Sequence, residues 1–155
     1  MIDVRPFESF VNSPDALTYT IRGVRSAVKL TNFGATILGI AVPDTYGTRA
    51  DVVLGYSLFD SYLDNPACFG SSIGPSANRA DKAEIPLNGA VYHLPKNNGP
   101  DNQNNLHTDL IAGIHKRIWQ TKLDEAHNAV VFNIDLVDGE YGLPGNRHIT
   151  ARYEL

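Results

Sequence analysis

Residues 84–94, EIPLNGAVYHL, decide the fold class of this chain. Two short strand-like segments stand on either side of the dipeptide Asn88-Gly89. Asparagine and glycine both accept the positive φ angles of a type I′ turn, which joins two antiparallel strands through only two residues. The stretch therefore predicts a tight β-hairpin whose second strand covers residues 90–94.

The same alternation of strand-like runs and turn residues continues along most of the chain. Runs rich in Val, Ile, Thr and Tyr are separated by Gly, Pro, Asn and Asp, as is typical of strands and tight turns. The spacing favours an all-β antiparallel sandwich or barrel over repeated βαβ units. Besides 90–94, strands are predicted at residues 17–22, 27–31, 36–42, 51–54, 116–121, 130–136 and 148–155.

Only residues 57–64, SLFDSYLD, have a helical pattern. Leu58 and Tyr62 are one turn apart, and Ser57 is the predicted N-cap because its hydroxyl can accept a backbone N–H. One short helix does not change the all-β class.

The length and composition are those of a single soluble globular domain. The chain has 155 residues, of which 43% are hydrophobic and 19% charged, which suits a protein with an adequate core. The net charge is −4 and basic residues do not cluster, so a nucleic-acid partner is not expected.

The amino-terminal stretch MIDVRPFESF contains acidic residues and no continuous apolar run. It therefore predicts neither a secretory signal nor a transmembrane helix, and we expect a cytoplasmic protein without a membrane partner. The single cysteine, Cys68, excludes an internal disulfide. No histidine or basic residue lies near it in sequence to lower its pKa, so it is predicted to be a small buried apolar residue.

A long polar stretch, PKNNGPDNQNNLHTDL at residues 95–110, follows the predicted hairpin. Loops of this length usually carry a function or are disordered. Asp101, Gln103 and Asn105 alternate as the oxygen ligands of a calcium loop do, but the glycine and the glutamate that such a loop requires are missing. We therefore expect no calcium site.

Other cofactor and nucleophile motifs are also missing from the sequence. His93, His107 and His115 lack the close pairing with cysteine or a second histidine that is typical of zinc sites. No G-x-S-x-G occurs, and GSSIG at residues 70–74 is too short for a P-loop. The sequence predicts neither a metal nor another cofactor.

The pair Asn78-Arg79 stands just ahead of the hairpin, in SANRADKAEIPLNG at residues 76–89. Taken alone, an exposed surface arginine is the simpler interpretation. A series of longer motifs favours a functional one, and it runs in the order VKLTNFGATILGIAVPDTYGTRADVVLGYSLFDSYLDN, FGSSIGPSANRADKAEIPLNGAVYHLPKNNGP, NNLH, GIHKRIWQ and DGEYGLPGN. In order and spacing this series closely resembles the aldose 1-epimerase (galactose mutarotase) family, over roughly residues 15–155.

The resemblance implies a sugar site. In that family the Asn-Arg pair and the histidine of the LH motif contact the sugar, and the matching residues here are Asn78, Arg79 and His107. A planar guanidinium directs several N–H donors at sugar oxygens, and a neutral imidazole both donates and accepts. Arg79 stays protonated and cannot be a base, so its expected role is to hold an aldohexose such as galactose or glucose and to stabilise charge at oxygen during ring opening.

The resemblance also implies groups that this sequence does not contain. Mutarotation needs a base for the anomeric hydroxyl and an acid for the ring oxygen. The family supplies a glutamate and a second histidine from motifs that follow DGEYGLPGN, and nothing here matches them or the family's sugar-binding aspartate. No catalytic residue is therefore assigned within the chain, which is predicted to be inactive by itself.

The implied fold is the galactose mutarotase-like β-supersandwich, with residues 1–155 as the amino-terminal portion of one domain. The sequence HITARYEL at residues 148–155 is strand-like, and a terminus there would leave an unpaired, apolar sheet edge. We expect a truncated, split or partial product that pairs with a complementary carboxy-terminal chain or self-associates. Three functions stay open: an epimerase completed by residues outside this chain, a non-catalytic carbohydrate-binding remnant, and an inert interaction or structural fragment.

Two local departures from the family pattern leave the preferred aldose open. Pro75 follows Gly74 where the family commonly has an arginine, and Thr108 and Asp109 replace the glycines that usually follow the LH histidine. His115 also falls in a matching motif, but we interpret it as a structural residue of a loop or strand start. No role is assigned to His93, His127 or His148.

Overall fold

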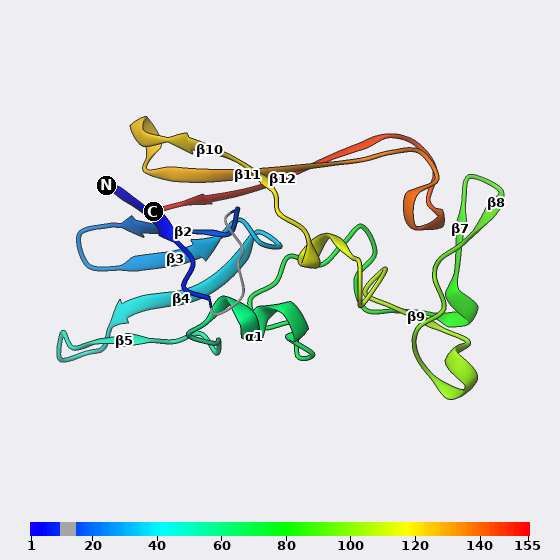
Figure 1. The fold of residues 1–155 in the computed structure, drawn as a ribbon, viewed down its shortest axis with the longest axis horizontal. Coiled ribbons are helices and arrows are strands. Elements are labelled where there is room, and N and C mark those ends of the chain that lie inside the picture. Colours follow the sequence, from blue (N-terminus) through cyan, green and yellow to red (C-terminus); the bar gives the residue numbers. More distant parts are fainter. Residues whose placement is uncertain (10–14) are drawn as a thin grey trace. The chain divides into compact units, whose positions relative to one another are not determined.

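The computed structural model describes residues 1–9 and 15–155, and most of its regular structure is β-strand (Figure 1). The strands are β1 (Ile2–Pro6), β2 (Leu17–Arg22), β3 (Ala27–Thr31), β4 (Thr36–Pro43), β5 (Arg49–Asp51), β6 (Arg79–Ala80), β7 (Glu84–Leu87), β8 (Ala90–His93), β9 (Asn105–Leu106), β10 (Gln120–Asp124), β11 (Ala129–Leu136) and β12 (Arg147–Glu154). The described α-helix is α1 (Phe59–Asp64), and short 3-10 turns cover Asp81–Ala83, Pro100–Asn102, Ile114–Lys116, Glu125–His127 and Glu140–Gly142.

The strands form antiparallel sheets, which confirms the predicted all-β class. Strands β1 to β5 follow one another in a five-stranded meander, and β10, β11 and β12 form a three-stranded sheet. Two small sheets pair β6 with β9 and β7 with β8. Within the described residues, no helix has the length and apolar character needed to cross a membrane.

The hairpin predicted from EIPLNGAVYHL is confirmed. Leu87 pairs with Ala90, so Asn88 and Gly89 form the two-residue turn, and their φ angles are 52° and 80°. Pro86 is tolerated inside β7 because this sheet has only two strands, and proline is restricted mainly in central strands.

Two of the predicted strands are wrong in position. The run 51–54 keeps only Asp51 in β5, because the Asp51 carboxylate accepts the backbone N–H of Val53 and turns the chain. The run 116–121 begins in a 3-10 turn and joins β10 only at residue 120. In the apolar part of this run, the backbone N–H of Trp119 donates a hydrogen bond to the carbonyl of Asn32, in the loop before β4.

The predicted roles of Ser57 and Cys68 are also wrong. Leu58, not Ser57, is the N-cap of α1, and no side chain caps the helix. The first helical N–H, from Phe59, donates instead to the carbonyl of Glu8 at 2.9 Å. Cys68 is half-buried and not fully buried, and its φ angle of 53° places it in a turn.

The chain divides into two compact units. Unit 1 comprises Met1–Ser72, Ile118–Asn133 and Thr150–Leu155, and unit 2 comprises Ile73–Arg117 and Ile134–Ile149. The prediction that residues 1–155 belong to one domain stays a prediction.

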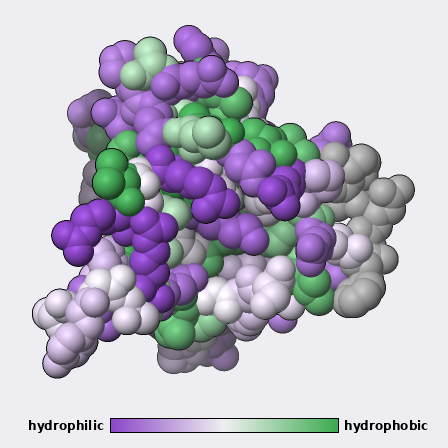
Figure 2. Space-filling model, turned by 90° about the vertical axis from the view of Figure 1, so that its left-hand side faces the viewer, coloured by the Kyte–Doolittle hydropathy of each residue, from purple (hydrophilic) through white to green (hydrophobic). Residues whose placement is uncertain are grey.

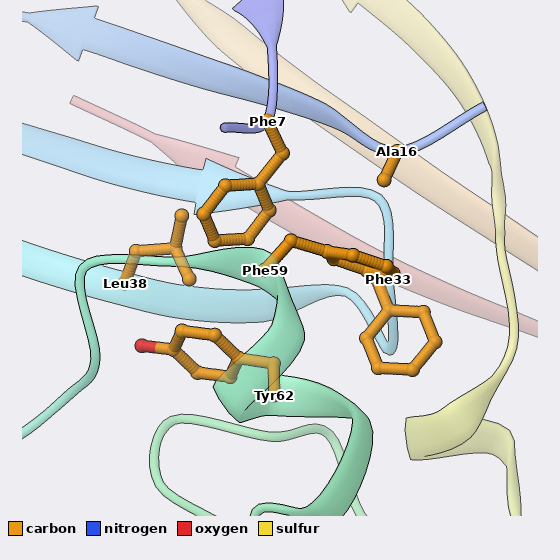
Figure 3. Packing of buried hydrophobic residues seen from close by; sticks show 6 residues of the cluster. All are labelled: Phe7, Ala16, Phe33, Leu38, Phe59 and Tyr62. Atoms are coloured by element: carbon orange, nitrogen blue, oxygen red, sulfur yellow. The ribbon is translucent and has the colours of Figure 1, made fainter. Parts of the chain in front are cut away.

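Unit 1 contains a cluster of buried aromatic side chains beside α1 (Figure 3). The ring of Phe59 meets the rings of Phe7 and Phe33 edge to face, with centroid distances of 5.6 and 5.1 Å. The buried Tyr62 hydroxyl accepts the backbone N–H of Tyr56 at 3.0 Å, and burial raises the pKa of this phenol. The helix predicted from one turn of apolar spacing is therefore fixed by this cluster.

The exposed side of β12 is polar, so the expectation of an apolar sheet edge is wrong. The strand does lie at the edge of its sheet, but its side chains alternate, and the exposed ones are polar. These exposed residues are His148, Thr150, Arg152 and Glu154. The apolar side chains within the strand, Ile149, Ala151 and Tyr153, are half-buried, because side chains of a strand point alternately to opposite faces. Leu155, just after the strand, is exposed.

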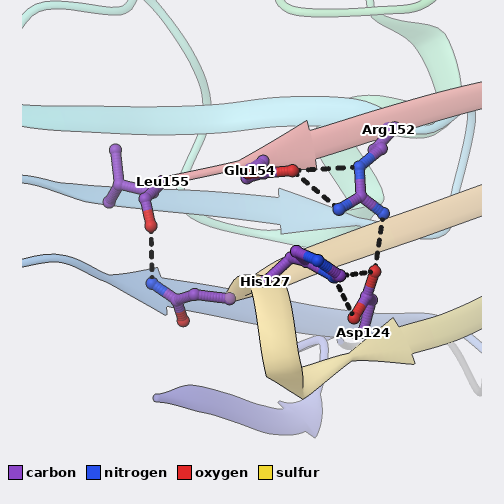
Figure 4. A network of polar contacts seen from close by, with 6 residues as sticks. Asp124, His127, Arg152, Glu154 and Leu155 are labelled. Atoms are coloured by element: carbon purple, nitrogen blue, oxygen red, sulfur yellow. Dashed lines mark hydrogen bonds and ion pairs between the residues drawn. The ribbon is translucent and has the colours of Figure 1, made fainter.

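A polar network joins β12 to the turn after β10 (Figure 4). The Arg152 guanidinium donates to Glu154 at 2.6 Å and to Asp124 at 2.9 Å, and His127 contacts the same Asp124 carboxylate. The contact with His127 and then that with Arg152 lower the pKa of Asp124.

Figure 2 shows one side of the molecule, where hydrophilic residues predominate and hydrophobic patches are small.

The aromatic cluster gives a stability prediction. Phe59→Ala should lower the free energy of unfolding by about 3–5 kcal/mol, because it removes a ring that is 3% exposed and leaves a cavity. Val24→Ala is the control, since Val24 is 96% exposed and should change stability by no more than about 0.5 kcal/mol. Urea denaturation measures both values, and a loss below 1 kcal/mol for Phe59→Ala would show that the cluster is not a stabilising core.

Candidate functional site

The three residues predicted to contact a sugar come together within unit 2. Strand β6 begins with Arg79, which pairs with Leu106 of β9, so that Asn78 and His107 stand opposite each other just beyond the ladder. Asn78 has a φ angle of 61° and His107 one of 57°. This left-handed region is uncommon for residues other than glycine, although Asn and His are enriched there. Such strained backbone is frequent at functional sites.

Two reciprocal hydrogen bonds fix the positions of Asn78 and His107. The backbone N–H of His107 donates to the Asn78 carbonyl at 3.0 Å, and the backbone N–H of Asn78 donates to Nδ1 of His107, also at 3.0 Å. A ring nitrogen accepts only through a free lone pair, so the imidazole in this arrangement is neutral with its proton on Nε2. The half-buried ring therefore offers one N–H donor to a ligand.

The exposed Arg79 guanidinium is oriented by two amide oxygens. Its Nε–H donates to Oδ1 of Asn98 at 3.1 Å, and Nη1 donates to Oδ1 of Asn78 at 3.3 Å. Two of the five guanidinium N–H groups are thus used, and the other three are available to a ligand. The fork is held in one orientation without an ion pair to any described carboxylate.

Asn98 is a residue of this cluster that the sequence did not single out. Its backbone exchanges hydrogen bonds with Asn104, at 3.1 and 2.9 Å, which closes a tight loop between them. Gly99 follows with a φ angle of 83°, and the Asn104 side chain fills the place of a Cβ there. The adjacent glycine was the available signal, but the five asparagines in this polar stretch gave no means of choosing among them.

The long polar stretch is ordered by its own asparagine side chains. Asn97 bonds both the carbonyl and the N–H of Leu106, and Asn105 bonds the backbone of Pro95 and Thr108. Asn105 is fully buried in these contacts, so its side chain is engaged by the backbone and not presented as the oxygen ligand that the calcium-loop pattern suggested. Among residues 1–9 and 15–155, no three His, Cys, Asp or Glu side chains gather as a metal site requires.

The two departures after the LH histidine have structural explanations. Thr108 has a φ angle of 66°, and its hydroxyl bonds both the N–H and the carbonyl of Ser76, at 2.9 and 2.8 Å. The Asp109 carboxylate accepts the N–H groups of Ile111 and Ala112, each at 2.8 Å. Both side chains therefore hold the loop that carries His107, and at Thr108 the backbone has a left-handed conformation that glycine would adopt without help.

His115 is buried, as its structural interpretation requires. Its exposure is 2%, and neither ring nitrogen has a hydrogen-bond partner among the described residues. Gly113 packs against the ring, since an added Cβ would lie 2.8 Å from two ring atoms. Burial, followed by the charge of Lys116, lowers the pKa of His115 to about 4.

The remaining histidines lie on the surface beside carboxylates. His93 faces Glu84 across the hairpin at 3.9 Å, His148 contacts Asp135 at 2.6 Å, and His127 contacts Asp124 at 2.9 Å. Each pair joins neighbours in a sheet or a turn, and none of these histidines is bonded to Asn78, Arg79 or His107.

A separate groove of about 670 Å³ lies on one face of the five-stranded sheet in unit 1. Its charged lining is partly neutralised within the protein, because Arg5 pairs with Asp3 at 2.8 Å and Asp51 accepts the N–H groups of Ile40 and Val53. No predicted site residue lines it. The cluster around Arg79 is therefore the better candidate site.

Comparisons with known proteins agree on one family. A family model described as aldose 1-epimerase matches residues 18–155. Galactose mutarotase of Rattus norvegicus is 34% identical over 137 residues, which are 88% of this chain and 38% of the relative. Aldose 1-epimerase of Haemophilus influenzae is 33% identical over 150 residues, 93% of this chain and 41% of the relative.

Solved structures show the same fold. A GalM/aldose epimerase homologue from C. elegans superposes with a TM-score of 0.79 at 26% identity, covering 90% of this chain and 42% of that one. Galactose 1-epimerase from Lactobacillus acidophilus NCFM also gives a TM-score of 0.79, at 25% identity, covering 100% of this chain and 44% of that one. The chain thus spans about two fifths of the length of the relatives it matches.

The burial of His115 predicts how stability depends on pH. The folded state disfavours the proton that the unfolded state binds below pH 6.5, so unfolding takes up a proton and stability falls as the pH decreases from 6.5 to about 4. The full loss is on the order of 3 kcal/mol. His115→Gln should remove this slope, whatever its effect on absolute stability, as measured by urea denaturation across that pH range.

His93→Gln is the matched control for this experiment, because the His93 side chain is 69% exposed. It should leave the slope unchanged. An equal slope for His115→Gln and the unmodified protein would mean that His115 is not the group that binds the proton.

Proposed function

The chain belongs to the aldose 1-epimerase family, and from that membership we propose that it supplies the sugar-orienting residues of a mutarotase active site. The reaction is the interconversion of the α and β anomers of an aldohexose such as galactose or glucose. Asn78, Arg79 and His107 hold the sugar, and no cofactor takes part.

The observation that carries this proposal is the fixed set of N–H donors at the end of the β6–β9 pair. The two bonds between Asn78 and His107 hold the backbone, and two amide oxygens hold the Arg79 fork. A set of donors that is oriented before the ligand arrives binds oxygen atoms without a further cost of ordering. It also stabilises negative charge that develops on a sugar oxygen when the ring opens.

The cluster cannot by itself move the protons of mutarotation. Arg79 does not deprotonate, and Nδ1 of His107, the atom that could accept a proton, already accepts the Asn78 N–H. No carboxylate among the described residues is hydrogen-bonded or ion-paired to these three side chains. We therefore assign the general acid and the general base to residues outside this sequence, on the same longer chain or on a complementary one.

Because the proposed acid and base lie outside this sequence, we expect that the 155-residue chain alone does not accelerate mutarotation. A general acid or base typically contributes about 10²–10⁴-fold in rate, and positioning without either should leave the spontaneous rate nearly unchanged. Polarimetry on freshly dissolved α-D-galactose and α-D-glucose measures this rate. Acceleration in proportion to the concentration of the pure chain would place an acid and a base within residues 1–155.

Sugar binding without acceleration would separate the proposed half-site from the two other functions. A chain that binds sugar and gains activity when mixed with a complementary chain is the orienting part of an enzyme. A chain that binds sugar and gains no activity from such a partner is a carbohydrate-binding protein. Absence of binding by titration calorimetry would leave only a structural or interaction role.

Arg79 provides the direct test of the sugar site. Arg79→Ala should weaken sugar binding about 10- to 100-fold, because a hydrogen bond from a charged donor is worth about 1.5–3 kcal/mol. Arg79→Lys should restore little, since a single ammonium does not reproduce the planar fork. Where the chain works within an active assembly, turnover should fall in parallel.

Arg25→Ala is the control, because Arg25 is an exposed arginine of unit 1. Both alanine variants should change the free energy of unfolding by no more than about 0.5 kcal/mol. If Arg79→Ala unfolds unit 2, or leaves sugar affinity unchanged, then Asn78-Arg79 is a structural or merely exposed pair.

A further inference from the structure

The loop that joins β11 to β12 is a motif of the family resemblance that the proposed sugar site leaves without a role. Its sequence is DGEYGLPGN, and its residues, 138–146, all belong to unit 2. The Gly139 N–H donates to the Leu143 carbonyl at 3.0 Å, and the Gly142 N–H donates to the Gly139 carbonyl at 2.9 Å. These bonds give the segment a defined shape, and we call residues 138–146 the β11–β12 loop.

Two anchors fix the β11–β12 loop within unit 2. The first is Glu140, whose carboxylate accepts from Nη1 of Arg117 at 2.7 Å. The second is Gly142, which has a φ angle of 76° and packs so closely against the His93 carbonyl that a Cβ would not fit. Tyr141 lies between the two anchors and is held in place from both sides, with a φ angle of 58° that tyrosine rarely adopts.

The Tyr141 side chain connects the β11–β12 loop to the segment that follows His107. Its hydroxyl donates to the Ala112 carbonyl at 2.8 Å. Tyr141 is half-buried, and burial raises the pKa of its phenol, so the hydroxyl keeps its proton and stays a donor at neutral pH. This bond therefore ties together two parts of unit 2 that are 29 residues apart in sequence.

Two further hydrogen bonds continue from Ala112 to His107. The Ala112 N–H donates to Oδ1 of Asp109 at 2.8 Å, and the Asp109 N–H donates to the His107 carbonyl at 2.7 Å. The His107 carbonyl is thus held from this side, while its N–H and its ring atom Nδ1 are bonded to the backbone of Asn78. Three consecutive hydrogen bonds therefore lead from the Tyr141 hydroxyl to the residue that carries the imidazole.

We propose that Tyr141 is a positioning residue for His107, because these three bonds hold the imidazole in the orientation that presents its Nε2–H to a sugar. This inference rests on the proposed sugar-orienting function and adds a residue to it. The φ angle of His107 is 57°, a strained value for a residue other than glycine, and such strain persists only where surrounding contacts impose it. When the bonds beyond Asp109 are lost, the backbone of His107 can leave this region, and the ring moves with it.

Tyr141→Phe tests the inference because it removes only the hydroxyl. Galactose affinity, measured by NMR titration of the 155-residue chain, should fall about two- to tenfold, which is the range of one neutral hydrogen bond. Without sugar, the imidazole ¹⁵N signals of His107 should change from those of one Nε2–H tautomer to those of a mixture, since Nδ1 loses its fixed partner. Tyr92→Phe is the matched control and should change neither readout, because Tyr92 is a half-buried tyrosine of unit 2 outside the three bonds.

Asp109 provides a second test that includes a conservative variant. Asp109→Ala removes the Oδ1 acceptor and should reproduce both effects of Tyr141→Phe. Asp109→Asn keeps an Oδ1 acceptor and should restore most of the affinity and the His107 signals. Because both residues act through the same bonds, the double variant Tyr141→Phe/Asp109→Ala should weaken galactose binding by no more than about twofold beyond the more severe single variant.

The outcomes separate this inference from the sugar site itself. Unchanged His107 ring signals in Tyr141→Phe, or in Asp109→Ala where the first variant does not fold, would show that these bonds do not position His107. Fully additive losses of affinity in the double variant would also overturn the inference. Ring signals that change while galactose affinity stays constant would support Tyr141 as a positioning residue and contradict the contact between His107 and the sugar. If the unmodified chain binds no galactose, the proposed function fails, and the ring signals still decide the role of Tyr141.

Discussion

The paired hydrogen bonds between Asn78 and His107 are the constraint on which the candidate site depends. Strands β6 and β9 have only two residues each, so their ladder alone gives weak control over register. The reciprocal bonds just beyond it hold two left-handed residues face to face. Since Arg79 follows Asn78 directly, the same contacts fix the backbone position from which the Arg79 side chain extends.

In this region, amide side chains form the hydrogen bonds to the backbone that a longer sheet would otherwise supply. Backbone N–H and carbonyl groups must find partners wherever they are removed from water. Between residues 95 and 108 the partners are supplied largely by Asn97 and Asn105, whose amides both donate and accept. The Asn104 side chain accepts the backbone N–H of Lys82. An irregular segment satisfied in this way can adopt the bends that strand and helix exclude, which brings Asn98 to the Arg79 guanidinium.

The parts of the fold that sequence predicted well are those fixed by local chemistry. The Asn88-Gly89 turn and the strands at 17–22 and 27–31 follow from residues that touch one another along the chain. The failures involve distant partners: Trp119 bonds to Asn32 in place of a ladder, and α1 takes its first acceptor from Glu8 in place of Ser57. The amino-terminal β1 was missed, because its five residues include only two that are typical of strands.

The same distinction applies to the site. The family resemblance named Asn78, Arg79 and His107, but the 29-residue separation of Asn78 and His107 hides their contact from any local pattern. Asn98 could not be identified from the sequence for another reason, since its role depends on one oxygen in a stretch of similar amides. Only the three-dimensional structure shows that this oxygen accepts a hydrogen bond from the Arg79 guanidinium.

The proposed sugar-orienting role rests on the direction of these bonds. A group that removes a proton needs a basic atom with a free lone pair; amide oxygens are too weakly basic, and the Nδ1 lone pair of His107 already accepts the Asn78 N–H. A group that steadies developing negative charge needs free donors, and these are what the cluster retains. In the proposed function, binding and proton transfer therefore belong to different residues. On that proposal, the acid and the base approach the sugar from a side that Asn78, Arg79 and His107 do not occupy.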